Sequence, residues 1–410
     1  MDLLPDSAQQ EIVDTTASFL DDVLPIERLR TGDTQASRPD DGLWRQMAEL
    51  GWFGLAIPES SGGVGLSLVE EILLLRELGR RVGPLQVLAT VVAARVAAEA
   101  GDEDRLEALI QGRARAGWAE PLSSWVRRSG VSGEIQIYDG DGVDFWVVVD
   151  QDGGFLFDAK PLPYAPHPCV DEFTDLGRAV LEDSLPCVRV DSGPGLFQVG
   201  ALLVAALLSG VGEAARDQSA TYAQERKQFG RPIGVYQAIK HPCANMAVRS
   251  EAAWSQVAYS ALALRAGHAD AGFQISAAKH LAGEAALENA SANVQVHGGY
   301  GFTTEYDAHL LVKRANVLNA VAGPSRFHLQ RILELEPLAE ALGRILRRQS
   351  KKSNSATKSE LGYERMCRVS DDPRLKRKPA PGIWRGRRLN MMGVGRGFLG
   401  LRNMVGEASR

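Results

Sequence analysis

The first segment that could carry chemistry is a cationic run near position 226. It reads Glu225-Arg-Lys-Gln-Phe-Gly230 at the end of a long helical pattern, and a second pattern starts at Gln237. Arginine and lysine beside a turn can form a cradle for an anion. The helix dipole alone also favours cations at a helix C-terminus, so both interpretations stay open at this point.

The second segment contains two adjacent glycines. Gly298 and Gly299 lie within Val294-Gln-Val-His-Gly-Gly-Tyr-Gly-Phe-Thr-Thr-Glu-Tyr306, where another helical pattern ends. Residues without a side chain let a second backbone or a ligand approach closely. A glycine C-cap explains the pair equally well. Neither segment identifies a function by itself, so the elements that carry them have to be considered.

The composition is that of an ordinary globular protein. The 410 residues are 45% hydrophobic, 24% charged and 7% aromatic, and 46 Lys and Arg against 51 Asp and Glu give a formal net charge of −5. These values exclude a disordered or fibrous chain, and they argue against nucleic acid as a partner. The four cysteines include no Cys-x-x-Cys pair, so no metal site is expected.

No export or membrane signal is visible. The first residues are acidic where a secretory signal needs a basic patch, so the default location is cytoplasmic. The longest apolar run, from Val199 to Leu208, is about half the roughly 20 residues that cross a bilayer. We expect it to be a buried helix and the chain to have no transmembrane segment.

Hydrophobic periodicity divides the chain into a helical part, a β part rich in β-branched and aromatic residues, a second helical part and a basic tail. The predicted boundaries are, in order, 1–112, 113–190, 191–346 and 347–410. The predicted helices of the second helical part are 197–226, 237–266, 273–296 and 324–346.

The tail differs from the body in charge. From Arg344 to Arg410 there are 18 basic and 5 acidic residues, a net charge of +13, whereas the preceding body carries −18. Its start has too few apolar groups to offset the entropy of ordering, so we expect flexibility. Such a tail can bind an anionic surface, a carrier protein or nucleic acid, or it can lie on the acidic body.

Together, at this spacing, the two segments resemble the acyl-CoA dehydrogenase family. The resemblance extends over nearly the whole body, and Leu50-Gly-Trp-Phe-Gly-Leu-Ala-Ile-Pro-Glu-Ser-Ser-Gly-Gly-Val-Gly-Leu66 is similar to the family's N-terminal domain. The resemblance implies a mainly α fold with a small β domain: an N-terminal helical domain, a middle β-barrel and a C-terminal four-helix bundle.

The resemblance also implies FAD, bound at a subunit interface in dimers or tetramers. The family residue that matches Arg226 contacts the FAD pyrophosphate, for which a guanidinium is a suitable planar, charged partner. Five further matching positions line the cofactor of a neighbouring subunit: Phe229, Gln237, Gln295, Gly298 and Gly299.

The implied reaction is α,β-dehydrogenation of an acyl thioester, in which a base removes the α-proton and hydride leaves to the flavin. The usual base is a glutamate. The matching position holds Ala322, and the alternative position, on the first helix of the bundle, holds Gly200. Neither residue can accept a proton, so we predict no catalytic residue on this chain.

The middle domain also departs from the family, which predicts a weak flavin grip on the redox side, whereas a later motif and the missing glutamates point to a heteromeric enzyme. Ala119-Glu-Pro121 matches the family's Thr-Glu-Pro only in part, and the flavin-facing strand of the middle domain has no clear counterpart. Phe302-Thr-Thr-Glu-Tyr-Asp-Ala-His-Leu310 resembles a bacterial subgroup, often steroid- or polyketide-associated, that pairs a base-bearing with a base-lacking subunit. We therefore predict the non-base subunit of an α₂β₂ acyl-CoA dehydrogenase in lipid or polyketide metabolism.

This prediction specifies the partners. They are a dehydrogenase-like subunit, an acyl-CoA or acyl-carrier thioester and an electron-transferring flavoprotein as acceptor. Two other classes of protein remain open, because a fold does not fix a function. A homo-oligomeric flavoenzyme of altered chemistry, such as an oxidase or monooxygenase, would hold FAD alone. A scaffold paralogue would bind a partner without flavin reduction by any thioester.

Seven other residues carry polar groups from which an active site could be assembled: Glu120, His297, Glu305, Asp307, His309, Ser325 and His328. We expect the two carboxylates after the glycine turn to cap the next helix. We expect His297 to be packed and hydrogen-bonded, His309 to be interfacial or structural, and Glu120 to be structural. Ser325 and His328 lie near the usual base segment, where either could serve a changed chemistry.

Overall fold

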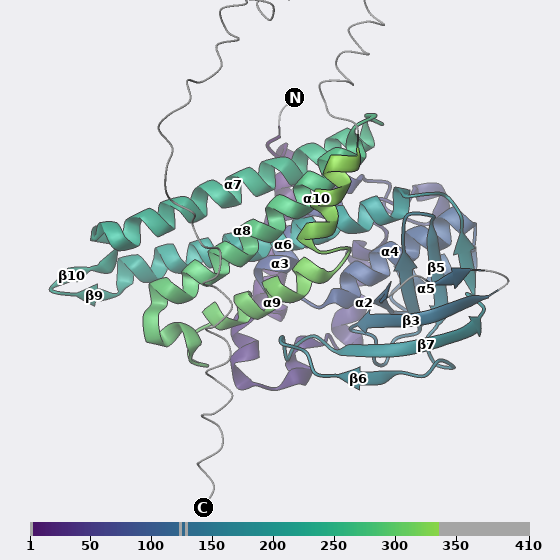
Figure 1. Ribbon diagram of the computed structural model, residues 1–410, viewed down its shortest axis with the longest axis horizontal. Helices are drawn as coiled ribbons and strands as arrows, with labels where there is room; N and C mark the ends of the chain where they lie inside the picture. The colour runs from purple at the N-terminus through teal and green to yellow at the C-terminus, as the bar shows by residue number, and fades with distance from the viewer. Residues whose placement is uncertain (1–2, 123–124, 128–129, 336–410) are drawn as a thin grey trace, which may run out of the picture. The chain divides into compact units, whose positions relative to one another are not determined.

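The computed structural model describes residues 3–122, 125–127 and 130–335. The predicted tail, 347–410, and the end of the predicted helix 324–346 lie outside these residues. Along the described chain, helices are followed by a sheet and then by helices again (Figure 1). This order confirms the predicted mainly α fold with a small β domain, while the exact domain boundaries stay a prediction.

The N-terminal part consists of α-helices joined by short 3₁₀ helices. Their bounds are α1 (Ser7–Val23), η1 (Ile26–Thr31), η2 (Thr34–Ser37), α2 (Asp41–Glu49), η3 (Trp52–Gly54), η4 (Glu59–Ser61), α3 (Leu68–Arg80), α4 (Leu85–Ala100) and α5 (Glu103–Ile110). Capping boxes start α1, with Asp6 and Gln9, and α3, with Ser67 and Glu70. Helix α4 is buried along most of its length, because it packs between the sheet and α6.

The middle part is a sheet with the strand order β6-β7-β3-β1-β4-β5-β8, and β2 pairs with β3. Strands β1 and β4 are parallel, and the other pairs are antiparallel. The strands are β1 (Ala116–Pro121), β2 (Val126–Arg127), β3 (Val131–Tyr138), β4 (Phe145–Val149), β5 (Gly154–Asp158), β6 (Ala165–His167), β7 (Leu176–Ser184) and β8 (Val188–Val190).

The two faces of this sheet belong to different cores. Along β1 the side chains alternate, so that Trp118 joins the main core with the helices, while Ala119 joins a second core inside the β domain. The same alternation places Glu120 on the face that Trp118 uses. Strand β1 therefore presents one large aromatic ring and one carboxyl group to the helical bundle.

The C-terminal part is a bundle of long helices. Their bounds are α6 (Gly195–Glu225), α7 (Gln237–Arg265), α8 (Ala271–His297), α9 (Ala308–Ala320) and α10 (Ser325–Glu334). The first three lie within two residues of the predicted bounds. Between α6 and α7 the chain forms a hairpin, β9 (Lys227–Gln228) and β10 (Arg231–Pro232), followed by η5 (Ile233–Val235). Figure 1 shows this hairpin at the end of the bundle that lies away from the sheet.

Helix α6 is the central element of the bundle. It is long and apolar enough to cross a membrane, but 78% of its most apolar window is buried inside the protein. The run from Val199 to Leu208 lies in this helix and is buried apart from its first residue, as predicted for a core helix. The main core continues from α6 into α3, α4, α8 and one face of the sheet.

Candidate functional site

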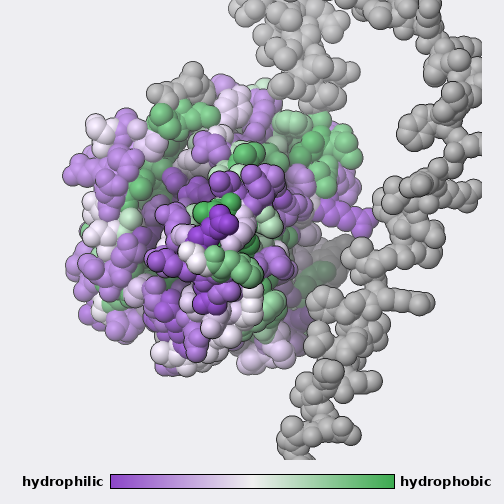
Figure 2. Space-filling model, turned by 90° about the vertical axis from the view of Figure 1, so that its left-hand side faces the viewer, coloured by the Kyte–Doolittle hydropathy of each residue, from purple (hydrophilic) through white to green (hydrophobic). Residues whose placement is uncertain are grey.

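The hairpin after α6 carries the cationic run on an exposed turn. Phe229 and Gly230 form its two-residue loop, both with positive φ, 51° and 80°. This backbone suits the right-handed twist of a tight hairpin, but it is unusual for a phenylalanine. The Phe229 side chain is 90% exposed. Figure 2 faces this end of the bundle and shows hydrophobic side chains among hydrophilic ones.

Arg226 is the C-cap residue of α6, and its backbone N–H donates to the carbonyl of Tyr222. Its guanidinium carbon lies 5.5 Å from the centroid of the Tyr300 ring, within the range of a cation–π contact. The side chain is exposed and makes no ion pair with any of the described residues. Arg226 is therefore available to an anion from outside the chain.

The paired glycines lie where α8 passes into the turn η6 (Gly298–Phe302). Gly298 has φ of +61°, and a Cβ atom added at Gly298 or at Gly299 would meet nothing within 4 Å. Close packing inside this chain therefore does not require a glycine at either position. Both residues are exposed and present bare backbone to the surroundings. This arrangement suits close approach by a ligand or a neighbouring subunit.

Two cavities meet at these glycines. One, of about 480 Å³, is lined by Arg226 together with Tyr222, Gln228 and Tyr300. The other, of about 580 Å³, has Gln295 and His309 among its lining residues. The structure thus gathers four of the six predicted cofactor residues around one turn. The other two, Phe229 and Gln237, line neither cavity; Gln237 is the exposed first residue of α7, and Phe229 lies at the hairpin tip.

The two positions that match the family's base are buried and covered by strand β1. A Cβ atom at Gly200 would lie 2.7 Å from Cη2 of Trp118, so the indole ring occupies the space in front of this glycine. The ring's Nε1 donates to the Glu120 carboxylate at 2.6 Å. The same carboxylate accepts a hydrogen bond from the backbone N–H of Ala322. We call this set Trp118, Glu120 and Ala322 the bracket.

The two ionisable groups at the bracket, Glu120 and Lys279, are largely desolvated. Burial raises the pKa of Glu120, which the hydrogen bonds from Trp118 and Ala322 partly oppose. Lys279 of α8 is fully buried and donates to the carbonyls of Asn319 and Gly323 at 3.2 and 3.1 Å. Burial lowers the pKa of Lys279 to about 7, and the charge of Glu120 opposes this shift.

Sequence reasoning did not find Trp118 or Lys279. A signal existed for the lysine, because it directly follows Ser276-Ala-Ala278, small residues typical of a helix face that packs closely in a core. No local signal marks Trp118, since an aromatic residue in a strand is ordinary core material. Its role depends on the distant glycine that it covers.

The histidines are packed rather than poised for catalysis. His297 is buried, its Nδ1 lies 2.8 Å from the Asn293 carbonyl, and its ring stacks on Tyr222 at 4.1 Å. Nδ1 of His309 lies 2.9 Å from the Tyr306 carbonyl. His328 is also buried, with Nε2 at 2.8 Å from the Ala322 carbonyl, and burial lowers its pKa to about 4.

The remaining polar residues differ from expectation. Ser325 lies 2.6 Å from Nδ1 of His280 on α8. The prediction that Glu305 and Asp307 cap the next helix is wrong. Glu305 is exposed in the preceding loop, and Asp307, although it is the N-cap residue of α9, makes no side-chain cap hydrogen bond. Its backbone is αR, with φ of −90° and ψ of −1°, rather than the extended conformation of a capping aspartate. Its carboxylate instead accepts two hydrogen bonds from the guanidinium of Arg30.

Comparison with known proteins identifies the class. Residues 6–115 match the acyl-CoA dehydrogenase N-terminal domain, and residues 194–335 match the acyl-CoA dehydrogenase C-terminal domain. The chain belongs to the acyl-CoA dehydrogenase family. Members of this family are oxidoreductases that act on CH–CH groups.

Particular relatives refine this placement. The chain is 31% identical to acyl-CoA dehydrogenase IpdE2 of Mycobacterium tuberculosis, covering 77% of this chain and 92% of that protein. It is 34% identical to acyl-CoA dehydrogenase FadE34 of the same organism, over 74% of this chain and 43% of that protein. Among solved structures, a variant of the Tcur3481–Tcur3483 steroid ACAD matches with a TM-score of 0.70 and 27% identity, covering 82% of this chain and 99% of that chain.

Proposed function

We propose that this chain is the non-base subunit of a heteromeric, FAD-dependent acyl-CoA dehydrogenase that forms an α,β double bond in an acyl thioester. One observation carries the proposal: the positions from which a base would act are closed, whereas the predicted cofactor contacts are open. A subunit of this kind would contribute to a site that is completed by a dehydrogenase-like partner subunit.

The closed side supports the absence of a base on this chain. A side chain at either base position has to reach the same α-proton, so the thioester has to lie between the two positions. Here the Trp118 ring fills the space in front of Gly200, and Glu120 is tied to the backbone of Ala322. The partner would therefore supply the base and the acyl cavity.

The open side fits FAD. The Cβ positions of Gly298 and Gly299 are unobstructed, and the guanidinium of Arg226 has no carboxylate partner among the described residues. We assign the pyrophosphate to Arg226 and the remaining contacts to five residues: Phe229, Gln237, Gln295, Gly298 and Gly299. When bound, FAD supplies the hydride acceptor; the role of these residues is to bind and orient it at the interface.

The names of two similar proteins support an acyl-CoA dehydrogenase made of two components. IpdE2 is named an acyl-CoA dehydrogenase, and the similar solved structure is titled a steroid ACAD of two named components. We extend to this chain an acyl-CoA or acyl-carrier thioester as substrate, an electron-transferring flavoprotein as acceptor, a cytoplasmic location and a role in lipid or polyketide metabolism.

The decisive experiment measures flavin content and oligomeric mass of the purified chain, alone and co-expressed with a neighbouring dehydrogenase-like protein. Anaerobic bleaching of the flavin absorbance by acyl-CoA follows. FAD that appears and bleaches only in the complex supports the proposal. Full FAD and turnover in the homo-oligomer would refute it and indicate a self-sufficient flavoenzyme. A complex whose flavin no thioester reduces would indicate a scaffold.

Two neighbouring arginines provide a matched pair of variants. Arg226→Gln removes the proposed pyrophosphate contact, and we expect FAD affinity of the complex to fall about tenfold or more. Arg231→Gln changes an arginine in the same hairpin whose guanidinium lies over Tyr236, at 5.5 Å from the ring centroid. This control should retain FAD at the level of the unmodified complex. Equal retention by both variants would contradict the role of Arg226.

A further inference from the structure

The loop between α8 and α9, residues 298–307, carries the predicted cofactor glycines and is largely exposed. Within the loop, hydrogen bonds join residues close in sequence, such as those from the backbone N–H and Oγ1 of Thr303 to the Tyr300 carbonyl. Among the described residues, Arg30 of η1 makes the hydrogen bonds that connect this loop to the N-terminal helices. Within the part of the chain that the structure describes, Asp307 is therefore the point at which hydrogen bonds tie the loop to the N-terminal helices.

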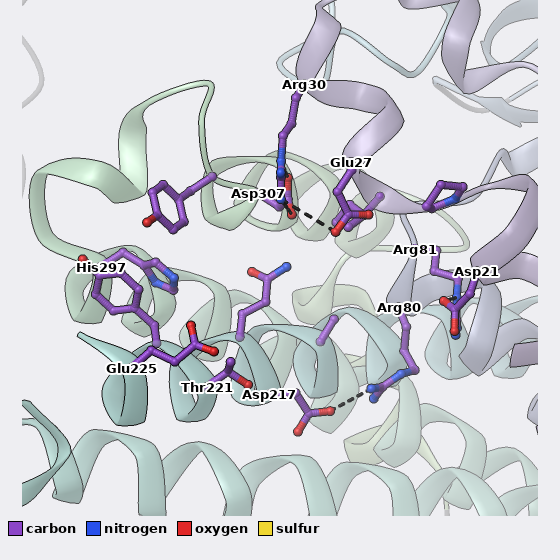
Figure 3. A pocket seen from close by; sticks show the side chains of 16 residues that line it. Asp21, Glu27, Arg30, Arg80, Arg81, Asp217, Thr221, Glu225, His297 and Asp307 are labelled. Atoms are coloured by element: carbon purple, nitrogen blue, oxygen red, sulfur yellow. Dashed lines mark hydrogen bonds and ion pairs between the residues drawn. The ribbon is translucent and has the colours of Figure 1, made fainter. Parts of the chain in front are cut away.

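That point is a bidentate ion pair. Nε and Nη2 of Arg30 each lie 2.7 Å from one oxygen of the Asp307 carboxylate, and the Asp307 side chain is only 6% exposed. Glu27 adds a second carboxylate at 3.7 Å from Arg30. Hydrogen bonding to Asp307 raises the pKa of Arg30. Figure 3 shows the pair bridging from the N-terminal helices to the end of the loop.

Aromatic contacts connect this pair to the proposed cofactor arginine. Tyr306, the neighbour of Asp307 in the chain, contacts the ring of His297 edge-on at 5.5 Å and the ring of Tyr300 at 5.6 Å. The guanidinium of Arg226 lies over the other end of this series, on Tyr300. A continuous set of packed groups therefore runs from Asp307 to Arg226. A shift of Tyr306 would displace the Tyr300 ring on which the guanidinium of Arg226 lies.

We propose that Arg30 and Asp307 form a clasp by which the N-terminal helices position the cofactor-binding loop before FAD arrives. The inference rests on the proposed function, because it treats residues 298–307 and Arg226 as cofactor contacts. Arg30 is a positioning residue and touches no cofactor itself. A loop that is already ordered binds more tightly, since less ordering entropy is lost on binding. Opening the clasp should therefore weaken FAD binding without removing a contact.

The test compares Arg30→Gln and Arg30→Lys with a matched control, Arg105→Gln. Arg105 forms a single pair with Asp102, at 2.6 Å and similar exposure of the arginine, but far along the chain from the loop. Hydrogen–deuterium exchange on the full chain needs neither FAD nor a partner. We expect amide exchange in 298–307 to rise about tenfold in Arg30→Gln, less in Arg30→Lys, and not at all in the control.

The second measurement is the FAD dissociation constant of the complex. It should rise about tenfold in Arg30→Gln and stay unchanged in Arg105→Gln. The charge-exchanged double variant Arg30→Asp/Asp307→Arg should recover part of the affinity.

The outcomes separate the clasp from the proposed function. Unchanged exchange in Arg30→Gln would overturn the clasp. Faster exchange with unchanged FAD affinity would overturn its positioning role and leave a merely structural pair. An unmodified complex that binds no FAD would refute the proposed function and the cofactor role of the clasp together, and this is visible without any variant.

Discussion

The role assigned to Glu120 can be tested by removing its acceptor atoms. Its carboxylate holds two donors of buried residues, Nε1 of Trp118 at 2.6 Å and the backbone N–H of Ala322. A buried donor left without an acceptor costs about 1–3 kcal/mol, so Glu120→Ala should lower the free energy of unfolding by about 2–6 kcal/mol. Glu120→Gln keeps an oxygen in place and should cost less than about 1.5 kcal/mol.

Urea denaturation of the full chain, followed by tryptophan fluorescence, measures both values. Glu134→Ala is the control, because Glu134 lies on the adjacent strand β3 and forms only an exposed pair with Arg178 at 3.4 Å. Loss of such a surface pair costs about 1 kcal/mol at most. If Glu120→Ala is no less stable than this control, the bracket does not stabilise the fold.

A second readout distinguishes a structural carboxylate from a catalytic one. We expect the complex that contains Glu120→Gln to turn over acyl thioester as the unmodified complex does. A general base supplies about 10²–10⁴-fold in rate, and an amide cannot replace it. A fall of about a hundredfold in turnover by a Glu120→Gln complex of normal stability would show that Glu120 is the base and would refute the non-base assignment.

Two further predictions concern the closed side of the site. Gly200→Ala places a Cβ atom 2.7 Å from Trp118 and 3.5 Å from Val149, so overpacking should lower stability by about 1–3 kcal/mol, partly offset by about 1 kcal/mol of helix propensity. Thermal unfolding should show that the loss is smaller when Trp118→Phe is also present. Strictly additive effects of the two substitutions would contradict the contact. Burial lowers the pKa of His328 from 6.5 to about 4. As the pH falls, His328 therefore becomes protonated near pH 6.5 in the unfolded chain but only near pH 4 in the folded chain. The contribution of His328 to stability should therefore fall by about 3 kcal/mol as the pH drops through this window. Urea unfolding at each pH should show this change as a difference between the unmodified chain and His328→Phe. A constant difference between the two from about pH 7 to 4 would contradict the assignment.

Helices α6, α7 and α8 were predictable because their ends are marked locally, whereas no bounds were predicted for α9 (Ala308–Ala320). Helix α7 was expected over 237–266 and spans Gln237–Arg265, and it is preceded by a hairpin whose tip contains Gly230. A glycine also follows α8, where Gly298 has positive φ. Glycines and prolines act on the backbone next to them, so a single sequence shows their effect.

The bracket and the clasp could not be predicted because their partners are distant in the sequence. Glu120 and Ala322 are 202 residues apart, and Arg30 and Asp307 are 277 apart. The local rule that an aspartate before a helix caps it gave the wrong role for Asp307. It failed because the backbone of Asp307 is αR and its carboxylate accepts hydrogen bonds from a guanidinium in another part of the fold.

The exposed hairpin tip argues that the open side faces a partner molecule. Phe229 holds a left-handed backbone, which costs roughly 1–2 kcal/mol in a residue other than glycine. Its ring is 90% exposed, so burial inside this chain does not offset that cost. Burying a phenylalanine side chain contributes about 1.5–3 kcal/mol. A cofactor or a second subunit that covers this ring would supply that compensation.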